Sequence, residues 1–191
     1  MTTPQIERVA PWVARAPDVP AWWFRRTSWL HGESHTRRVH VHAQRLLERL
    51  RWDEADARLV LQAALWHDMG RETDSVEPPH GARGAARADE LGLTAGLPPD
   101  DAALVRFAIT RHSLPDGGAA THAAELAAAE DRARRLAQPE RALRVLWVLK
   151  DADALDRVRL GLGERADPRQ LRHPEAIDQI GFADRLYAAL T

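Results

Sequence analysis

The sequence predicts an all-α fold, a compact bundle of roughly seven or eight helices, and three observations support this prediction. Apolar residues recur at steps of three and four along most of the chain after Ala21, which is the spacing of one helix face. Long alternating runs of β-branched residues, which are typical of strands, are missing. Stretches such as EPPHGARG and LPPDD, which cannot continue a helix, separate the periodic segments.

The expected helices begin and end at residues that favour helix boundaries. Asp53 and Asp100 are expected to cap the helices that follow them, because a carboxylate accepts hydrogen bonds from the first free N–H groups of a helix. Pro139 stands where a first helical turn begins. In chain order, the helices are expected over about residues 21–30, 33–51, 54–68, 82–92, 99–112, 119–137, 140–160 and 175–189.

The first twenty residues differ from the rest of the chain. Four prolines occur there, so this segment is expected to form an arm or loop rather than a packed helix. The remaining residues show no change in composition that would divide them into two domains. We therefore expect an N-terminal arm over residues 1–20 and a single helical domain over residues 21–191.

The composition narrows the classes of function. With 45% hydrophobic residues, 29% charged residues and a net charge of -1, the chain resembles a soluble globular protein, and nucleic acid is disfavoured as its main partner. Cysteine is absent, so any metal ion must be held by imidazole and carboxylate groups. No stretch has the apolar run of a signal peptide or the roughly 20 apolar residues of a membrane span. We expect a cytoplasmic protein without a membrane partner.

Polar residues interrupt the apolar faces of four expected helices. His35 begins the apolar face of the helix expected over residues 33–51, whereas His67 and Asp68 end the face of the helix expected over residues 54–68. His112 likewise ends the apolar face of the helix expected over residues 99–112. Asp153 follows apolar positions of the helix expected over residues 140–160, although periodicity does not separate it from Asp151 as the functional carboxylate.

Each of these positions also has an ordinary explanation. A lone histidine on an apolar face is more often a hydrogen-bonded core residue than a metal ligand. His67 and Asp68 can end a helix through an ion pair with Arg71, and DADALD can be a solvated acidic patch beside Arg157 and Arg159. The same change on four helices favours a shared explanation, which is one divalent ion bound by imidazole nitrogen and carboxylate oxygen.

Three segments together resemble the HD-domain superfamily of metal-dependent phosphohydrolases, which has a histidine, a later adjacent His-Asp pair and a distant aspartate. They are HGESHTRRVHVHA, ALWHDMGRE and KDADALDRV, and the resemblance covers about His31 to Leu160. It implies an HD-type helical fold. It also implies His35, His67, Asp68 and Asp153 as ligands of a divalent ion, with Asp151 as the alternative to Asp153. The ion can be Mn, Fe, Co, Ni, Zn or Mg.

The resemblance also implies a second metal or substrate site. Superfamily members with two metals add histidines between the pair and the last aspartate, and the candidates here are His80 and His112. Gly81, Gly84 and Ala85 after His80 indicate close packing of a helix near the site. The remaining histidines fit no such pattern and are expected at the surface: His31, His40, His42, His122 and His173.

The implied activity is hydrolysis of a phosphate ester or anhydride, in a phosphorylated small molecule such as a nucleotide, by a metal-activated water. Asp68 is expected to bind the metal and to handle protons, and Arg71 to bind the phosphate. Further candidates for phosphate contacts flank the motifs: Arg38, Arg111, Lys150 and Arg157. Trp22, Trp23, Trp29 and Trp66 can stack on a base, but a place in the core is favoured for them.

Two other functions stay open. A few superfamily members with the fuller set of histidines hold two irons and oxygenate small alcohols, and this set of residues is compatible with that chemistry. A non-catalytic interaction module, in which an ion ties the helices together, is the third interpretation. An open coordination position would favour an enzyme, and a closed one a structural site.

Overall fold

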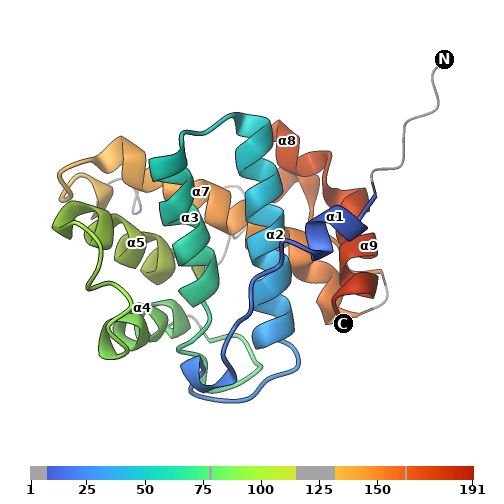
Figure 1. Ribbon diagram of the computed structural model, residues 1–191, viewed down its shortest axis with the longest axis horizontal. Coiled ribbons are helices and arrows are strands. Elements are labelled where there is room, and N and C mark those ends of the chain that lie inside the picture. The colour runs from blue at the N-terminus through green and yellow to red at the C-terminus, as the bar shows by residue number, and fades with distance from the viewer. Residues whose placement is uncertain (1–7, 78, 115–131, 162) are drawn as a thin grey trace.

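The computed structural model describes residues 8–77, 79–114, 132–161 and 163–191, and this part of the chain is helical and contains no strand (Figure 1). The prediction of an all-α fold is therefore confirmed. The α-helices are α1 (Ala10–Val13), α2 (Glu33–Leu50), α3 (Glu54–Trp66), α4 (His80–Glu90), α5 (Pro99–His112), α7 (Pro139–Leu155), α8 (Pro174–Ile177) and α9 (Ile180–Ala189). Short 3-10 helices occur at η1 (Ala21–Trp23), η2 (Asp156–Leu160) and η3 (Pro168–Gln170).

The main core lies between α2, α3, α5 and α7. Helix α7 packs against the other three, and α4 packs against α5. Val39, Leu59, Val105 and Leu149, one from each of the four core helices, are completely buried. Figure 1 shows α2 and α3 side by side and antiparallel, so the first turn of α2 and the last turn of α3 lie at the same end of the bundle.

A second, smaller core joins the two ends of the described chain. Val41 of α2 packs with Phe182 and Leu186 of α9, and Trp12 of α1 packs edge-on against Phe182 with ring centroids 6.3 Å apart. The prediction of no packed helix before Ala21 is therefore wrong for Ala10–Val13, because the proline of this segment stands in the first helical turn, where it is tolerated. The division into a 1–20 arm and a 21–191 domain stays a prediction.

Tertiary hydrogen bonds replace the helix predicted over residues 21–30. The helix stops after Trp23, since Phe24 has an extended backbone with φ -78° and ψ 142°. The N–H of Arg25 then donates to the carbonyl of Met69 at 3.1 Å, which ties this loop to the turn after α3. Most of the helix predicted over residues 119–137 lies outside the described residues.

The helix boundaries test the capping predictions. The Asp53 side chain accepts a hydrogen bond from the N–H of Asp56 at 2.9 Å, and Pro139 is the first residue of α7, so both predictions are confirmed. Asp100 does not cap α5, because the helix already begins at Pro99 and places Asp100 inside its first turn. The helix predicted over residues 140–160 changes to 3-10 geometry at Asp156, and the one predicted over 175–189 is divided into α8 and α9.

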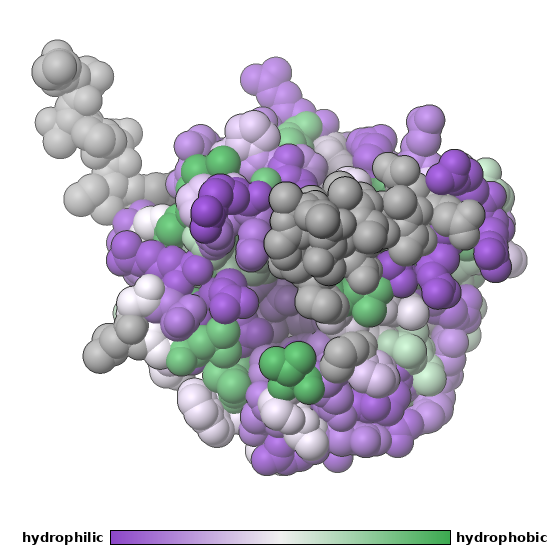
Figure 2. Space-filling view, turned by 180° about the vertical axis from the view of Figure 1, so that it is seen from behind, coloured by the Kyte–Doolittle hydropathy of each residue, from purple (hydrophilic) through white to green (hydrophobic). Residues whose placement is uncertain are grey.

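The face of the molecule seen in Figure 2 is mostly hydrophilic, with small separate groups of apolar residues. In the described part of the chain, no helix has both the length and the hydropathy needed to cross a bilayer.

Candidate metal centre

Helix ends bring the candidate ligands together. His35 comes from the first turn of α2, and His67 and Asp68 come from the turn that ends α3. His80 is the first residue of α4, whereas His112 is the last residue of α5. Asp153 lies in the last turn of α7. The structure thus brings into one cluster the four residues that were expected to bind a metal and the two that were expected at a second metal or substrate site: His35, His67, Asp68, Asp153, His80 and His112.

The four histidines of this cluster all engage their Nδ1 atoms in hydrogen bonds that point away from it. The acceptors are a carboxylate or backbone carbonyls, so each Nδ1 carries the hydrogen and, in a neutral ring, Nε2 carries the free lone pair. This arrangement is the usual one for histidines that bind a metal through Nε2. The hydrogen bonds join His35 to Asp156 Oδ2 (2.7 Å), His67 to the carbonyl of Ala64 (2.8 Å), His80 to that of Glu77 (2.6 Å) and His112 to that of Ile109 (2.6 Å).

The Nε2 atoms of these histidines face one another in two pairs. His35 Nε2 lies 3.2 Å from His67 Nε2, and His80 Nε2 lies 3.0 Å from His112 Nε2. Two lone pairs at this distance repel each other unless a proton or a metal ion lies beside them. The geometry therefore provides two positions where a cation would be stabilised.

Asp68 lies between the two pairs of histidines. Its Oδ2 is 3.5 Å from His35 Nε2 and 3.6 Å from His67 Nε2, whereas its Oδ1 is 3.1 Å from His80 Nε2 and 3.5 Å from His112 Nε2. One carboxylate oxygen thus faces each pair. Asp68 therefore lies within reach of a cation at either pair.

Electrostatics within the cluster favour positive charge. Burial and Arg159 both oppose a charge on His35, but hydrogen bonds with Asp153, Asp156 and Asp68 outweigh them and raise the pKa of His35 to about 9. Burial raises the pKa of Asp68, yet the surrounding histidines outweigh burial and hold it well below the usual range. Without a metal, a proton on His35 supplies the positive charge that these carboxylates require.

The two candidate aspartates of α7 have different surroundings. Asp153 Oδ1 is 3.3 Å from His35 Nε2, and this buried oxygen has no hydrogen-bond partner among the described residues. Asp151 instead accepts hydrogen bonds from the backbone N–H groups of Arg172 and His173 at 3.0 Å, and from His173 Nδ1 at 2.8 Å. Asp153, and not Asp151, therefore belongs to the cluster.

The donor set fits a divalent metal ion. Three overlapping groups each place one ligand atom per residue within 4.8 Å of the others. Imidazole nitrogen and carboxylate oxygen suit the metals from manganese to zinc. The groups are His31, His35 and Asp68; His35, His67 and Asp153; and His67, Asp68 and His112.

His31 was expected at the surface, but the structure buries it beside the cluster. It is 6% exposed, and its Nδ1 lies 3.2 Å from Asp68 Oδ2. His31 stands in the loop before α2, so the helical pattern gave no reason to place it near His35. The four-residue spacing in HGESH was the available signal.

Surface positions were also expected for other histidines, and the structure contradicts most of these predictions. His40 and His42 are buried on α2, where burial lowers the pKa of each to about 4. His173 is partly buried by its contact with Asp151. His122 lies outside the described residues.

Glycines allow α4 to approach the cluster closely, as the sequence predicted. A side chain at Gly81 would lie 2.5 Å from the carbonyl oxygen of Ile109, and one at Gly84 would lie 2.6 Å from that of His67. Ala85 is buried in the main core. These contacts confirm the prediction of close packing and fix the position of His80.

A cavity of about 620 Å³ reaches the cluster from the surface and exposes His31, His80, His112 and Asp153 to it. Among the described residues, its remaining wall carries more cationic side chains than carboxylates, and the carboxylates are those of Asp74, Glu164 and Asp167. The cationic residues that line it are Arg71, Lys150, Arg157, Arg159 and Arg165.

Some of the residues predicted to contact phosphate lie at this cavity, and others do not. Arg71 lies at the cavity, where its Nε donates to Asp68 Oδ1 at 3.0 Å, and Lys150 and Arg157 line the same cavity. Arg38 does not: it is buried elsewhere and donates to Asp156 at 2.7 Å and to the carbonyl of Leu190 at 3.0 Å. Arg111 borders a separate, mostly apolar groove with Phe107 and Leu136.

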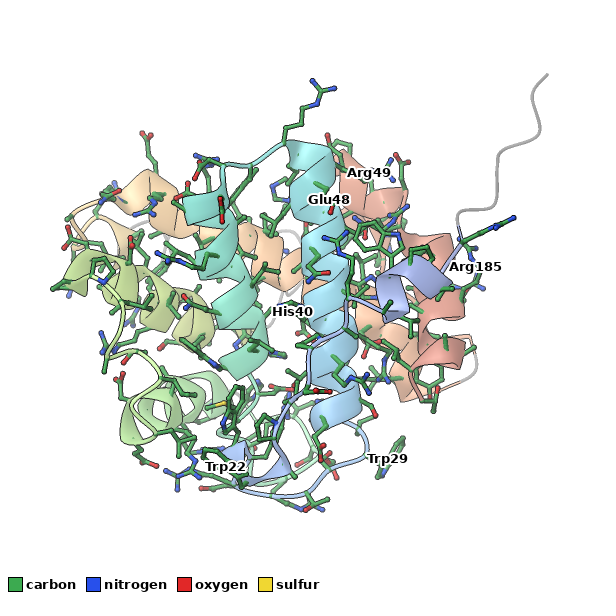
Figure 3. All side chains as sticks on the ribbon, viewed as in Figure 1. Trp22, Trp29, His40, Glu48, Arg49 and Arg185 are labelled. Carbon is green, nitrogen blue, oxygen red and sulfur yellow. The ribbon has the colours of Figure 1, made fainter. Side chains whose placement is uncertain are left out.

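None of the four tryptophans near the motifs lines the cavity. Trp66 is buried in the core and Trp23 packs against it, as favoured from the sequence. Trp22 and Trp29 are instead 64% and 77% exposed, and Figure 3 shows both at the outer edge of the fold, in the segment before α2. Trp22 lies in η1, and Trp29 lies in the loop that follows it.

Comparison with known proteins gives one finding. A family model described as HD domain matches residues 32–158. The matched segment contains all six clustered residues predicted as ligands, whereas His31 and Arg159 lie just outside its two ends. The searches of curated proteins and of solved structures gave no match.

Proposed function

The chain belongs to the HD domain family, and from this premise we propose that it is a phosphohydrolase that cleaves a phosphate ester or anhydride, most suitably of a nucleotide. Members of the family are generally metal-dependent phosphohydrolases, and the cluster of His and Asp residues provides a candidate metal site. The observation that most supports an enzyme is the cavity that opens onto His80, His112 and Asp153. A non-catalytic metal site would be closed by its own ligands.

The donor set suggests two ions that share one carboxylate. We assign His35, His67, Asp68 and Asp153 to the first ion, and Asp68, His80 and His112 to the second. When bound, such ions supply Lewis acidity at a phosphoryl oxygen and a water whose pKa is lowered toward about 7.

The chain's own residues hold the substrate and move the proton. Arg71 is anchored to Asp68 through Nε, so its guanidinium can neutralise charge on the phosphoryl group. Asp68 is 2% exposed and lies among the histidines, where it can orient the attacking water and take part in the transfer of its proton. Such burial limits bulk water at the cluster and strengthens each charge interaction there.

Charge balance favours a phosphorylated substrate. Asp68 and Asp153 are paired with the cations of Arg71 and Arg159, which lie at 3.0 and 3.7 Å from them. Divalent ions at the cluster would therefore leave the site positive. A phosphate group can balance this charge, whereas a neutral alcohol cannot.

The test is phosphate release from nucleoside mono-, di- and triphosphates with manganese, cobalt, nickel, zinc or magnesium added. Wild-type protein is compared with Asp68→Ala and with Asp178→Ala, a matched control at an exposed aspartate that pairs with Arg49 far from the cavity. We expect metal-dependent release that Asp68→Ala loses and Asp178→Ala keeps. Equal activity of Asp68→Ala and wild type would refute the proposal that the cluster around Asp68 is the active site.

One observation favours a second candidate, a di-iron oxygenase of a small alcohol. His80 and His112 complete the fuller histidine set that such relatives use, and both lie at the cavity. Silence across the nucleotide panel, together with bound iron and oxygen consumption, would select this candidate. Loss of one ion per chain in His112→Ala would test the assignment of the second ion in either case.

A further inference from the structure

Arg159 is a buried arginine at the inner wall of the cavity. Its side chain is 8% exposed, and it comes from η2, immediately after the metal-ligand helix α7. The guanidinium lies next to Asp153, at 3.7 Å, whereas that of Arg71 lies next to Asp68. The two arginines therefore border the carboxylates assigned to the two ions.

The hydrogen-bond donors of Arg159 are only partly used. One terminal nitrogen donates to the carbonyl of Asp156 at 3.1 Å, and Nε has no partner among the described residues. The other terminal nitrogen lies 3.4 Å from His31 Nδ1, which is also 3.2 Å from Asp68 Oδ2. A single ring nitrogen either donates or accepts, so when His31 donates to Asp68 this Arg159 nitrogen has no acceptor within hydrogen-bond distance in the described part of the chain, and its ion pair with Asp153 spans 3.7 Å.

Two arginines at the outer part of the cavity are more exposed than Arg159 and have carboxylate partners outside the cluster. Arg157 is 45% exposed and lies 3.6 Å from Glu164, and Arg165 is 60% exposed and pairs with Asp184 at 2.6 Å. Their charges are balanced by carboxylates that belong to no metal site. Arg159 is thus the buried cation whose remaining donors an incoming anion would satisfy, at a large energetic advantage over leaving them unpaired.

On the basis of the proposed phosphohydrolase function, we propose that Arg159 binds the phosphoryl group of the substrate on the Asp153 side of the site, with Arg71 on the Asp68 side. Arg157, although close in sequence, does not share this role.

Binding of inorganic phosphate tests the assignment without knowledge of the substrate. Phosphate is titrated calorimetrically into the full chain loaded with manganese, as wild type and as the variants Arg159→Gln, Arg159→Lys, Arg157→Gln and Arg49→Gln. Arg49 is a matched control, since it pairs with Asp178 and lies at the far end of α2 from the cluster (Figure 3). Metal content and circular dichroism are measured on every sample.

We expect Arg159→Gln to bind phosphate at least about tenfold more weakly than wild type, since it loses charge-assisted hydrogen bonds. The phosphate affinity of Arg159→Lys should lie between those of wild type and Arg159→Gln, because lysine keeps the charge and loses the planar pair of donors. The phosphate affinity of Arg157→Gln should stay within about twofold of that of wild type, and the affinity of Arg49→Gln should equal that of wild type.

The outcomes separate this inference from the function on which it rests. Wild-type protein that holds its metal but binds no phosphate would overturn the proposed phosphohydrolase. Phosphate binding that is equal in wild type and Arg159→Gln, or reduced equally by Arg157→Gln, would overturn the role of Arg159 alone. If Arg159→Gln loses its metal or its helicity, the phosphate affinity of Arg159→Lys is used instead. An affinity equal to that of wild type would overturn the role of Arg159.

Discussion

Substitution of Gly84 by alanine should separate the two proposed ions. Gly84 lies on α4 one turn after His80, where this helix crosses the turn that follows α3. An added methyl group would lie 2.6 Å from the carbonyl oxygen of His67, and 3.3 Å from both the Trp66 carbonyl oxygen and Ile109 Cγ2. The nearest obstacles are backbone atoms, which cannot rotate away, so α4 itself must move.

The size of the effect follows from two opposing terms. Overpacking by one methyl group costs about 1–3 kcal/mol, whereas alanine favours the helix by about 1 kcal/mol over glycine. Because the contact with the His67 backbone is so short, we expect a net loss of about 1–2 kcal/mol, which lowers Tm by about 2–8 °C in a chain of this length. The movement of α4 carries His80 away from His112, so the second ion should be lost while the first stays.

Thermal unfolding by circular dichroism and metal content by mass spectrometry test this prediction. The matched control is Gly181→Ala in α9, where an added methyl group meets nothing within 4 Å. We expect Gly181→Ala to keep the full metal content and to match or exceed the wild-type Tm. The reasoning is refuted if Gly84→Ala behaves like Gly181→Ala in both measurements.

Three further predictions concern stability. Asp156→Ala should lower the free energy of unfolding by about 3–5 kcal/mol, because Arg38 would stay buried without its carboxylate; a urea midpoint equal to that of wild type would contradict this. Burial lowers the pKa of His42 from 6.5 to about 4, so the unfolded chain binds this proton more readily than the folded chain. The free energy of unfolding should therefore decline by up to about 3 kcal/mol as the pH falls from 6.5 to about 4. His42→Leu should flatten that part of the pH profile of urea unfolding, and an unchanged profile would argue against this account. Chelation should lower the Tm of wild type and not that of Asp68→Ala, since bound ions stabilise only the folded state; an equal shift in both proteins would place the metal elsewhere.

Helical periodicity predicted the all-α fold and marked His35, His67, Asp68 and His112 as polar ends of apolar faces, whereas His80 and the choice of Asp153 over Asp151 rested on the resemblance to HD domains. His35, His67, His112 and Asp153 each end or begin an apolar face, and an apolar face has to be buried. Once these faces pack together, their polar ends meet. The prediction of the cluster therefore depended on burial, which the sequence pattern records directly.

Two residues at the site that the sequence did not predict, His31 and Arg159, lie where the backbone leaves the α-helical period. His31 approaches Asp68 from a loop, which has no period. In the 3-10 turn of η2, residues three apart are eclipsed, so Arg159 lies over Asp156 on the inner side while Arg157 points outward. A continuous α-helix over residues 140–160, as predicted, gave no reason to prefer Arg159 to Arg157.

Charge alone could not place the cations. Arg38 flanks His35 in the sequence, as a phosphate contact would, yet each nitrogen of its guanidinium donates to Asp156 or to the carbonyl of Leu190. Because Asp156 also accepts from His35 Nδ1, this buried ion pair orients a proposed ligand instead of binding substrate. The packing of η2 and of the end of α9 against α2 explains that difference.

The wide spacing of the proposed ligands along the chain bears on how the protein folds. His35 and Asp153 are brought together by the docking of α2 against α7, which closes a loop of most of the chain. A bound ion would act there as a reversible cross-link, and it would have no complete set of donors until that loop has closed. Metal capture is therefore expected late in folding, and the rate at which the refolding chain acquires its metal would report the completion of the whole bundle and not the formation of any single helix.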